Sequence, residues 1–185
     1  MNRKQWKTRR NCAVFVGICV IYLLVRVKKY EHKMLIFLPN VNSNEPWEFV
    51  ADFSNMKYLN PTVIDFVITD EAGNYDHWKY TAEYTEKLSH WPYLPNVAVA
   101  DFEVKTSPKK EKYFINSVHR TCLFLGLYCL NSESEFTFAT NNRTKGSVCE
   151  ESVTYECPVI LSSFCKREVQ YQRNAIMNNL RKKFS

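Results

Sequence analysis

The chain has 185 residues, with 25 Lys and Arg against 19 Asp and Glu, which gives a net charge of +6. Nine of the basic residues and one acidic residue lie in residues 1–33, so residues 34–185 carry a net charge of −2. The excess of positive charge therefore belongs to the N-terminal segment, and the remainder lacks the basic surface that nucleic-acid binding needs. That remainder is long enough for one domain with a sizeable core.

The N-terminal segment has the pattern of a membrane anchor. Residues 1–11 form a basic tail without acidic residues, and an apolar run over residues 12–25 is closed by Arg26, Lys28 and Lys29. We predict that residues 12–27 form one short transmembrane helix whose flanking basic side chains reach the membrane interface. A cleaved signal peptide and an organelle presequence are the alternatives. The first lacks small residues before a cleavage point, and the second should be an amphipathic helix rich in Arg and Ser.

Two further features concern the side of the membrane on which the domain lies. Asn142-Arg143-Thr144 is a glycosylation acceptor, and five cysteines follow the anchor. An oxidising lumen would suit these cysteines, although the odd number leaves at least one thiol unpaired and the pairing is open. We therefore expect a single-pass glycoprotein of the endoplasmic reticulum or another secretory-pathway membrane, with residues 34–185 in the lumen.

The pattern after the anchor predicts an α+β domain. A short strand over residues 34–38 is followed by two short helices between residues 44 and 60. Apolar residues with a period of two then predict about six antiparallel strands between residues 63 and 157. Most of them have one buried face, whereas both faces are mixed over residues 113–123. Apolar residues at helical spacing over residues 161–184 predict a long C-terminal helix, with Glu168 pointing away from its packed side.

Short motifs accompany this order of elements. Leu38-Pro39 ends the first strand, Trp47 lies in the first helix, and Ala51-Asp52-Phe53 and Leu59-Asn60-Pro61 precede the sheet. In these residues and in its element order, the chain resembles the START-like (SRPBCC) superfamily, whose members often have Trp-x-Pro in place of the last motif. The resemblance covers residues 34–184. It implies a helix-grip fold, in which a curved sheet of six to seven strands surrounds the long helix and leaves an apolar cavity.

The inner faces of the predicted sheet and helix supply candidate ligand contacts. These are mostly large apolar or aromatic side chains that share a face, together with one arginine: Trp78, Tyr80, Tyr84, Phe102, Val169, Arg173, Ile176 and Leu180. Arg173 or Tyr84 is the candidate partner for a polar headgroup, because an unpaired polar group would be costly there. We expect Met56 and Leu59, in the interrupted short helices, to form the gate.

These patterns predict a membrane-anchored domain that binds or transfers a hydrophobic ligand, in particular a lipid. One alternative is a cyclase- or hydrolase-like enzyme that uses His119, Tyr84 or Arg173 in the same cavity, and another is a structural adaptor with a filled core. The sequence has no Gly-rich phosphate loop, no Cys-x-x-Cys pair and no metal spacing among its histidines, so we predict no cofactor, metal or catalytic residue. The predicted partners are an apolar small molecule and the membrane, without nucleic acid.

Overall fold

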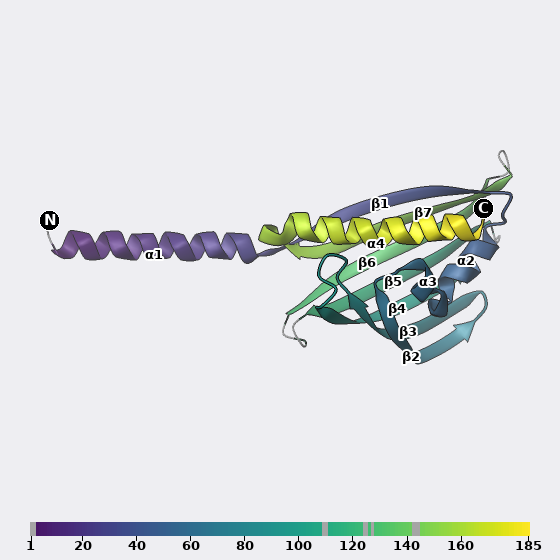
Figure 1. The fold of residues 1–185 in the computed structure, drawn as a ribbon, viewed down its shortest axis with the longest axis horizontal. Helices are drawn as coiled ribbons and strands as arrows, with labels where there is room; N and C mark the ends of the chain where they lie inside the picture. The colour runs from purple at the N-terminus through teal and green to yellow at the C-terminus, as the bar shows by residue number, and fades with distance from the viewer. Residues whose placement is uncertain (1–2, 109–110, 124–125, 127, 142–144) are drawn as a thin grey trace.

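In the computed structural model, one helix projects from a domain formed by a curved sheet and a second long helix (Figure 1). The structure describes residues 3–108, 111–123, 126, 128–141 and 145–185, so the predicted glycosylation site at Asn142 lies outside the described residues. The projecting helix is α1 (Arg3–Val25), and its large apolar side chains between Val14 and Val25 are exposed, from 39% for Leu24 to 68% for Phe15. No helix among the described residues combines the length and the apolarity needed to cross a membrane, so the expected transmembrane helix is not found there.

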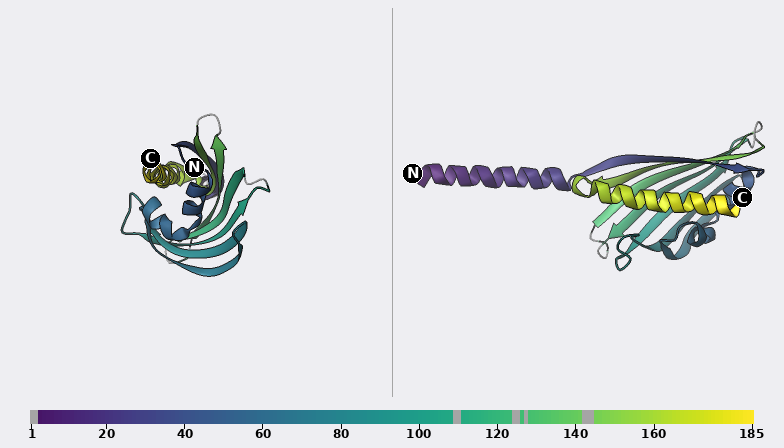
Figure 2. Two further views of the ribbon diagram at one scale, coloured as in Figure 1. Left: turned by 90° about the vertical axis from the view of Figure 1, so that its right-hand side faces the viewer. Right: turned by 45° about the horizontal axis from the view of Figure 1, so that its top comes forward.

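The domain is built on one antiparallel sheet of seven strands in the order β1-β7-β6-β5-β4-β3-β2. The sheet curves strongly and wraps around the helices on its concave side (Figure 2). Side chains alternate between buried and exposed positions, as the buried residues Ala98, Ala100, Phe102 and Val104 of β4 show. This arrangement confirms the predicted curved sheet and its period of two. The strands are β1 (Val27–Pro39), β2 (Val63–Asn74), β3 (His77–Lys87), β4 (Pro95–Thr106), β5 (Lys112–Leu123), β6 (Tyr128–Asn141) and β7 (Gly146–Pro158).

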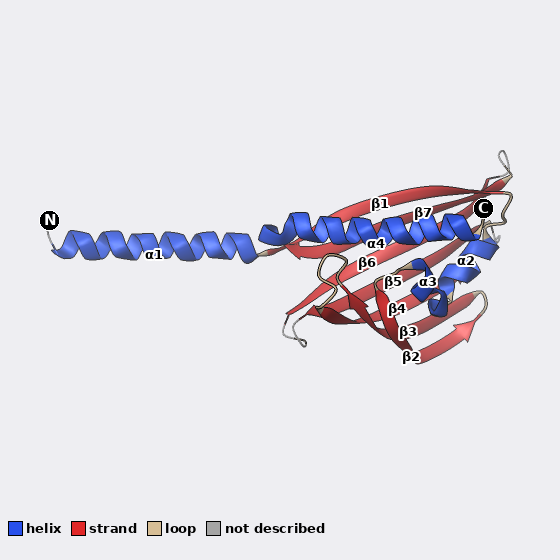
Figure 3. Ribbon diagram, viewed as in Figure 1, coloured by secondary structure: helices blue, strands red, loops and turns tan. Residues whose placement is uncertain are grey.

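The remaining helices lie on the concave face of the sheet (Figure 3). The long helix α4 (Ser162–Lys183) runs along this face, as predicted. The short elements α2 (Asn44–Ala51), η1 (Phe53–Asn55) and α3 (Met56–Leu59) cover the end of the sheet that is far from α1. The side chain of Asn179 joins the two groups, because it donates a hydrogen bond of 3.0 Å to the carbonyl oxygen of Leu59.

The short helices make that far end of the domain a packed core. Trp47 of α2 is 2% exposed, and Leu38, Phe138 and Leu180 are completely buried. The ring of Phe53 lies 5.1–5.5 Å from the rings of Phe66, Tyr84 and Phe102, which are within the range of favourable aromatic contacts. The apolar face that the sequence pattern predicts is therefore filled by protein over this half of its length.

The first strand is longer than the sequence pattern predicts. It begins at Val27, directly after α1, and Val27 pairs with Pro158 of β7. Residues 27–33, which we expected at the end of the anchor and ahead of the domain, therefore belong to the sheet. The backbone N–H of Val159, in the short helix η2 (Val159–Leu161), donates a hydrogen bond of 3.1 Å to the carbonyl oxygen of Arg26. The junction with α1 thus adjoins the start of α4.

Four of the five domain cysteines form disulfides. Cys122 and Cys129 join β5 to β6, and Cys157 and Cys165 join the end of β7 to the first turn of α4. Cys149 is buried with a free thiol, which agrees with the expectation of at least one unpaired cysteine.

Candidate ligand-binding cavity

A cavity of about 300 Å³ lies between the sheet and the N-terminal half of α4. Its walls include Pro158, Leu161 and Phe164, so it occupies the end of the domain where α1 joins the sheet. The size is at the lower end of the range that small-molecule sites occupy. Most of the wall is apolar: Leu88, Trp91, Leu123, Leu130, Val153, Tyr155, Leu161, Phe164 and Val169 line it.

The loop between β3 and β4 (residues 88–94) forms one side of the cavity and is held to α4 by a single carboxylate. Glu168 is 6% exposed and accepts hydrogen bonds from the backbone N–H of Ser89 at 2.7 Å and its hydroxyl at 2.8 Å. The same carboxylate lies 2.7 Å from Nδ1 of His90. Burial alone would raise the pKa of Glu168, but the hydrogen bonds from Ser89 and His90 lower it below its ordinary value. The carboxylate is therefore ionised when it holds the loop.

The polar side chains Arg173, Tyr84 and His119 in the cavity wall already form hydrogen bonds within the protein. Arg173 donates a hydrogen bond of 2.8 Å to Glu151, whose side chain is 1% exposed. Tyr84 and His119 are joined by a hydrogen bond of 2.9 Å at Nδ1, and Nε2 of His119 lies 2.8 Å from the hydroxyl of Ser117. Burial and the nearby guanidinium of Arg173 lower the pKa of His119 to about 3, so its imidazole is neutral at physiological pH.

Among the carboxyl groups of the cavity wall, Glu86 has a strongly raised pKa. It is 7% exposed and accepts a hydrogen bond of 3.0 Å from the side-chain amide of Asn96. Burial raises the pKa of Glu86 from 4.5 to about 7, although Arg173 opposes the shift. About half of these carboxyl groups therefore carry a proton near neutral pH.

Replacement of Glu86 by Gln should stabilise the protein at alkaline pH. Because the folded state holds this proton more tightly than the unfolded state, wild-type stability falls as the pH rises from 4.5 to about 7. The pKa difference corresponds to about 3 kcal/mol, and the Gln variant avoids this loss. Thermal or urea unfolding of the full chain at pH 5 and pH 8 should show an advantage for Glu86→Gln that is larger at pH 8. Glu83→Gln, on the exposed face of the same strand, is the control, and an advantage of Glu86→Gln that is equal at both pH values would contradict the expectation.

The structure brings only part of the predicted ligand-contact set to this cavity. Tyr84, Val169 and Arg173 line it. Phe102 and Ile176 instead border an adjoining void of only about 40 Å³, which shares Tyr84 and Arg173 with the cavity.

The other three predicted contacts lie in the packed part of the domain or directly beside it. Leu180 is completely buried in the core. Tyr80 is also in the core, and its hydroxyl donates a hydrogen bond of 2.8 Å to the carbonyl oxygen of Ala51. Trp78 borders an open groove near Trp47 and Tyr75. The aromatic side chains at this end of the domain pack against the short helices, so they do not line the cavity.

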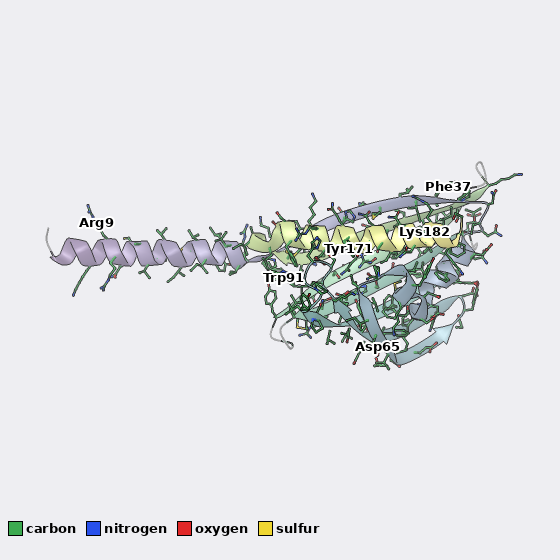
Figure 4. The ribbon with its side chains drawn as sticks, in the orientation of Figure 1. Arg9, Phe37, Asp65, Trp91, Tyr171 and Lys182 are labelled. Carbon is green, nitrogen blue, oxygen red and sulfur yellow. A yellow bond between two sulfur atoms is a disulfide. The ribbon has the colours of Figure 1, made fainter. Side chains whose placement is uncertain are left out.

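The structure also places the predicted gate away from the cavity. Leu59 is completely buried, and Met56 borders only the small void. The β3–β4 loop, and not the short helices, borders the cavity through Leu88 and Trp91. Figure 4 shows Trp91 of this loop near the start of α4, at the opposite end of the domain from Phe37 and Lys182.

Several residues of the cavity were not predicted from the sequence. Glu86 follows Tyr80, Ala82 and Tyr84 in the buried alternation of β3, so its position on the inner face was readable from the period of two. The prediction that Glu168 points away from the packed side is wrong, because its carboxylate faces the β3–β4 loop. No local pattern indicates that contact, which joins residues 79 positions apart. Among the described residues, no group of three His, Cys, Asp or Glu side chains could hold a metal ion.

Comparisons with known proteins identify the fold. No protein-family model and no curated protein matches the sequence. A START superfamily protein from Mycobacterium smegmatis aligns with a TM-score of 0.53 and 9% identity, over 84% of this chain and 96% of that one. A protein from Thermus thermophilus aligns with a TM-score of 0.57 and 10% identity, over 85% and 97% of the two chains. The di-domain ARO/CYC StfQ from the steffimycin biosynthetic pathway aligns with a TM-score of 0.53 and 10% identity, over 97% of this chain and 57% of that one. At these identities the similarity concerns the fold alone, and the sheet and α4 of this chain have the START-like helix-grip fold.

Proposed function

We propose that this protein binds one hydrophobic small molecule, a lipid, in the cavity between the sheet and α4. The observation that carries the proposal is an apolar cavity of about 300 Å³ between the sheet and the N-terminal half of α4, next to a buried hydrophobic core. A void of this size lined by apolar side chains forgoes packing contacts, which a bound apolar molecule restores. The START-like fold is consistent with such a ligand.

The polar groups of the cavity favour binding over catalysis. A general base needs a free nitrogen or oxygen within hydrogen-bonding distance of the substrate. In His119 both ring nitrogens are already bonded, to Tyr84 and to Ser117. Arg173 is engaged by Glu151. His119, Tyr84 and Arg173 therefore provide no free acid–base pair for a cyclase- or hydrolase-like reaction.

We further propose that the protein takes its ligand from a membrane to which α1 is attached. The large apolar side chains of α1 between Val14 and Val25 are exposed, and a helical segment that is hydrophobic on all sides needs apolar surroundings. Other exposed apolar side chains lie at the same end of the domain: Trp91 is 63% exposed, Ile160 59% and Leu161 47%. Trp91 and Leu161 also line the cavity. Aromatic side chains at such a position suit a membrane interface, so the ligand would have a short path from the bilayer into the cavity.

The disulfides support a lumenal position for the domain. Disulfides persist in the secretory pathway and are rare in the cytosol, and the domain contains two of them. We therefore propose that the domain faces the lumen of the endoplasmic reticulum or of another secretory-pathway compartment, with a glycan on Asn142.

Identification of the bound molecule tests the binding proposal. The full chain should be purified from cells in mild detergent, extracted with organic solvent and analysed by mass spectrometry. We expect one class of apolar molecule in near-stoichiometric amount, absent from a parallel extract of the same detergent with an unrelated membrane protein. An extract without an enriched molecule, together with no saturable binding of apolar probes, would favour the adaptor alternative.

Fractionation of cells tests the membrane and lumen proposals. The full chain should remain in the membrane pellet after alkaline washing, because the apolar residues of α1 are the proposed attachment. An endoglycosidase should lower its mass, and Asn142→Gln should abolish this change. A chain that is released by alkaline washing would contradict the attachment, and digestion of the domain by protease outside sealed microsomes would contradict the lumenal position.

A further inference from the structure

The ionisable side chains of the cavity wall carry an excess of acid. Glu86, Glu156 and Glu168 line the cavity, and Arg173 is the one lining residue with a permanent positive charge among the described residues. That charge is already paired, because the Arg173 guanidinium donates to the buried carboxylate of Glu151 at 2.8 Å. His119 adds no positive charge, since burial keeps its imidazole neutral. The wall therefore has no free cation, within the described part of the chain, that could neutralise an anionic ligand.

Two residues that line the cavity also hold buried hydrogen-bonding atoms without a partner among the described residues. Among the described residues, neither Nε of Arg173 nor the side-chain oxygen Oδ1 of Asn96 has a hydrogen-bond partner, and both atoms are buried. The first is a donor and the second an acceptor. Buried polar atoms of this kind cost free energy until a partner reaches them. A hydroxyl group can both donate and accept, so one such group is chemically suited to either atom.

We propose that the cavity selects an uncharged amphipathic ligand, an apolar molecule with one hydroxyl group, and discriminates against the corresponding carboxylic acid. This inference rests on the proposed function, since it concerns the ligand of the same cavity. An ionised carboxylate would enter an apolar site beside three carboxyl groups without a free cation among the described lining residues, and burial of an unpaired charge is expensive. The same apolar skeleton with a hydroxyl group avoids that cost and offers hydrogen bonds to Asn96 or Arg173.

Glu86 is the side chain that should control this discrimination. Its carboxyl group is 7% exposed and accepts one hydrogen bond, from Asn96. The carboxylates of Glu156 and Glu168 each accept at least two, from Asn131 and from Ser89 respectively. An ionised Glu86 repels a second carboxylate in the cavity. Glu86→Gln removes that charge and keeps an oxygen that accepts from Asn96, so it should change the affinity for acids and leave the affinity for alcohols nearly unchanged.

Three retinoids with one carbon skeleton provide the test: retinol, retinoic acid and retinylamine. Each is titrated into the full chain in mild detergent at pH 8, and binding is followed by quenching of tryptophan emission, to which Trp91 in the cavity wall contributes. We expect retinol to bind at least about tenfold more tightly than retinoic acid. Glu86→Gln should narrow this ratio severalfold by tighter binding of the acid, and Glu83→Gln, on the exposed face of β3, should leave it unchanged.

The outcomes separate this inference from the proposed function. If retinoic acid binds as tightly as retinol, or retinylamine more tightly than retinol, the cavity still binds apolar molecules but the selection for an uncharged ligand is wrong. If the ratio of the retinol and retinoic acid affinities is the same in Glu86→Gln as in the wild type, Glu86 does not control the discrimination. If none of the three retinoids binds and the solvent extract of the full chain contains no enriched apolar molecule, the proposed binding function and the inference both fail.

Discussion

Replacement of Arg173 by Met should lower the free energy of unfolding by about 3–5 kcal/mol, one of the largest effects that we expect for a side chain outside the packed core. Arg173 and Glu151 form an ion pair at 2.8 Å, and Glu151 is 1% exposed. The variant would leave the carboxylate of Glu151 buried with only the hydroxyl of Ser134, at 3.0 Å, as a hydrogen-bond donor among the described residues. Urea unfolding of the full chain, followed by far-ultraviolet circular dichroism, measures the loss.

A second substitution shows whether the buried charge causes this loss. In the double variant Glu151→Gln/Arg173→Met, the glutamine still accepts a hydrogen bond from Ser134 but carries no charge, so most of the stability should return. Arg167→Met is the control, because the exposed guanidinium of Arg167 lies 5.8 Å from the ring of Phe164 and should contribute less than about 1 kcal/mol. A double variant as unstable as Arg173→Met alone would mean that the loss comes from packing.

Much of the fold could be predicted from the sequence because each element carries a local pattern. The alternation of Tyr80, Ala82 and Tyr84 determines the inner face of β3, and the structure buries all three. The first half of β1 was missed because its side chains alternate between exposed and only half-buried positions. An edge strand of this kind is held by backbone pairing with β7, and backbone pairing has no signature in the side-chain pattern.

The presence of an apolar cavity could be predicted from the sequence, but its position along the sheet could not. Period and composition indicate which residues share an inner face, and Tyr84 and Phe102 share the inner face of neighbouring strands. Which of them contacts a void depends on what fills the face opposite. At one end Phe53 covers Phe102 and Tyr84, whereas at the other end α4 and the β3–β4 loop close the sheet. That difference arises from long-range packing, and the hydrogen bonds of Glu168 with Ser89 and His90 are an example of it.

Replacement of Val169 by Trp should abolish ligand binding without unfolding the protein. Val169 lies on α4, lines the cavity and packs against Val153, Tyr155 and Cys157 of β7. A tryptophan side chain here would occupy the space that we assign to the ligand. Overpacking of a filled core costs about 1–3 kcal/mol, but an indole that enters an empty apolar cavity gains contacts instead. We therefore expect the affinity for retinol to fall at least about 30-fold, equivalent to about 2 kcal/mol of binding free energy, with an unfolding midpoint equal to or above that of the ligand-free wild type.

Val118→Trp is the matched control for this variant. Val118 is 55% exposed on β5 and does not line the cavity, so the same change of side chain should leave retinol binding intact. If Val169→Trp folds and still binds retinol with wild-type affinity, the ligand does not occupy the cavity beneath α4. A lower unfolding midpoint in Val169→Trp would instead show that this space is already filled by protein, as the adaptor alternative requires. Since the cavity and the packed core share one sheet, the two measurements together determine whether the open half of the helix-grip fold serves a ligand.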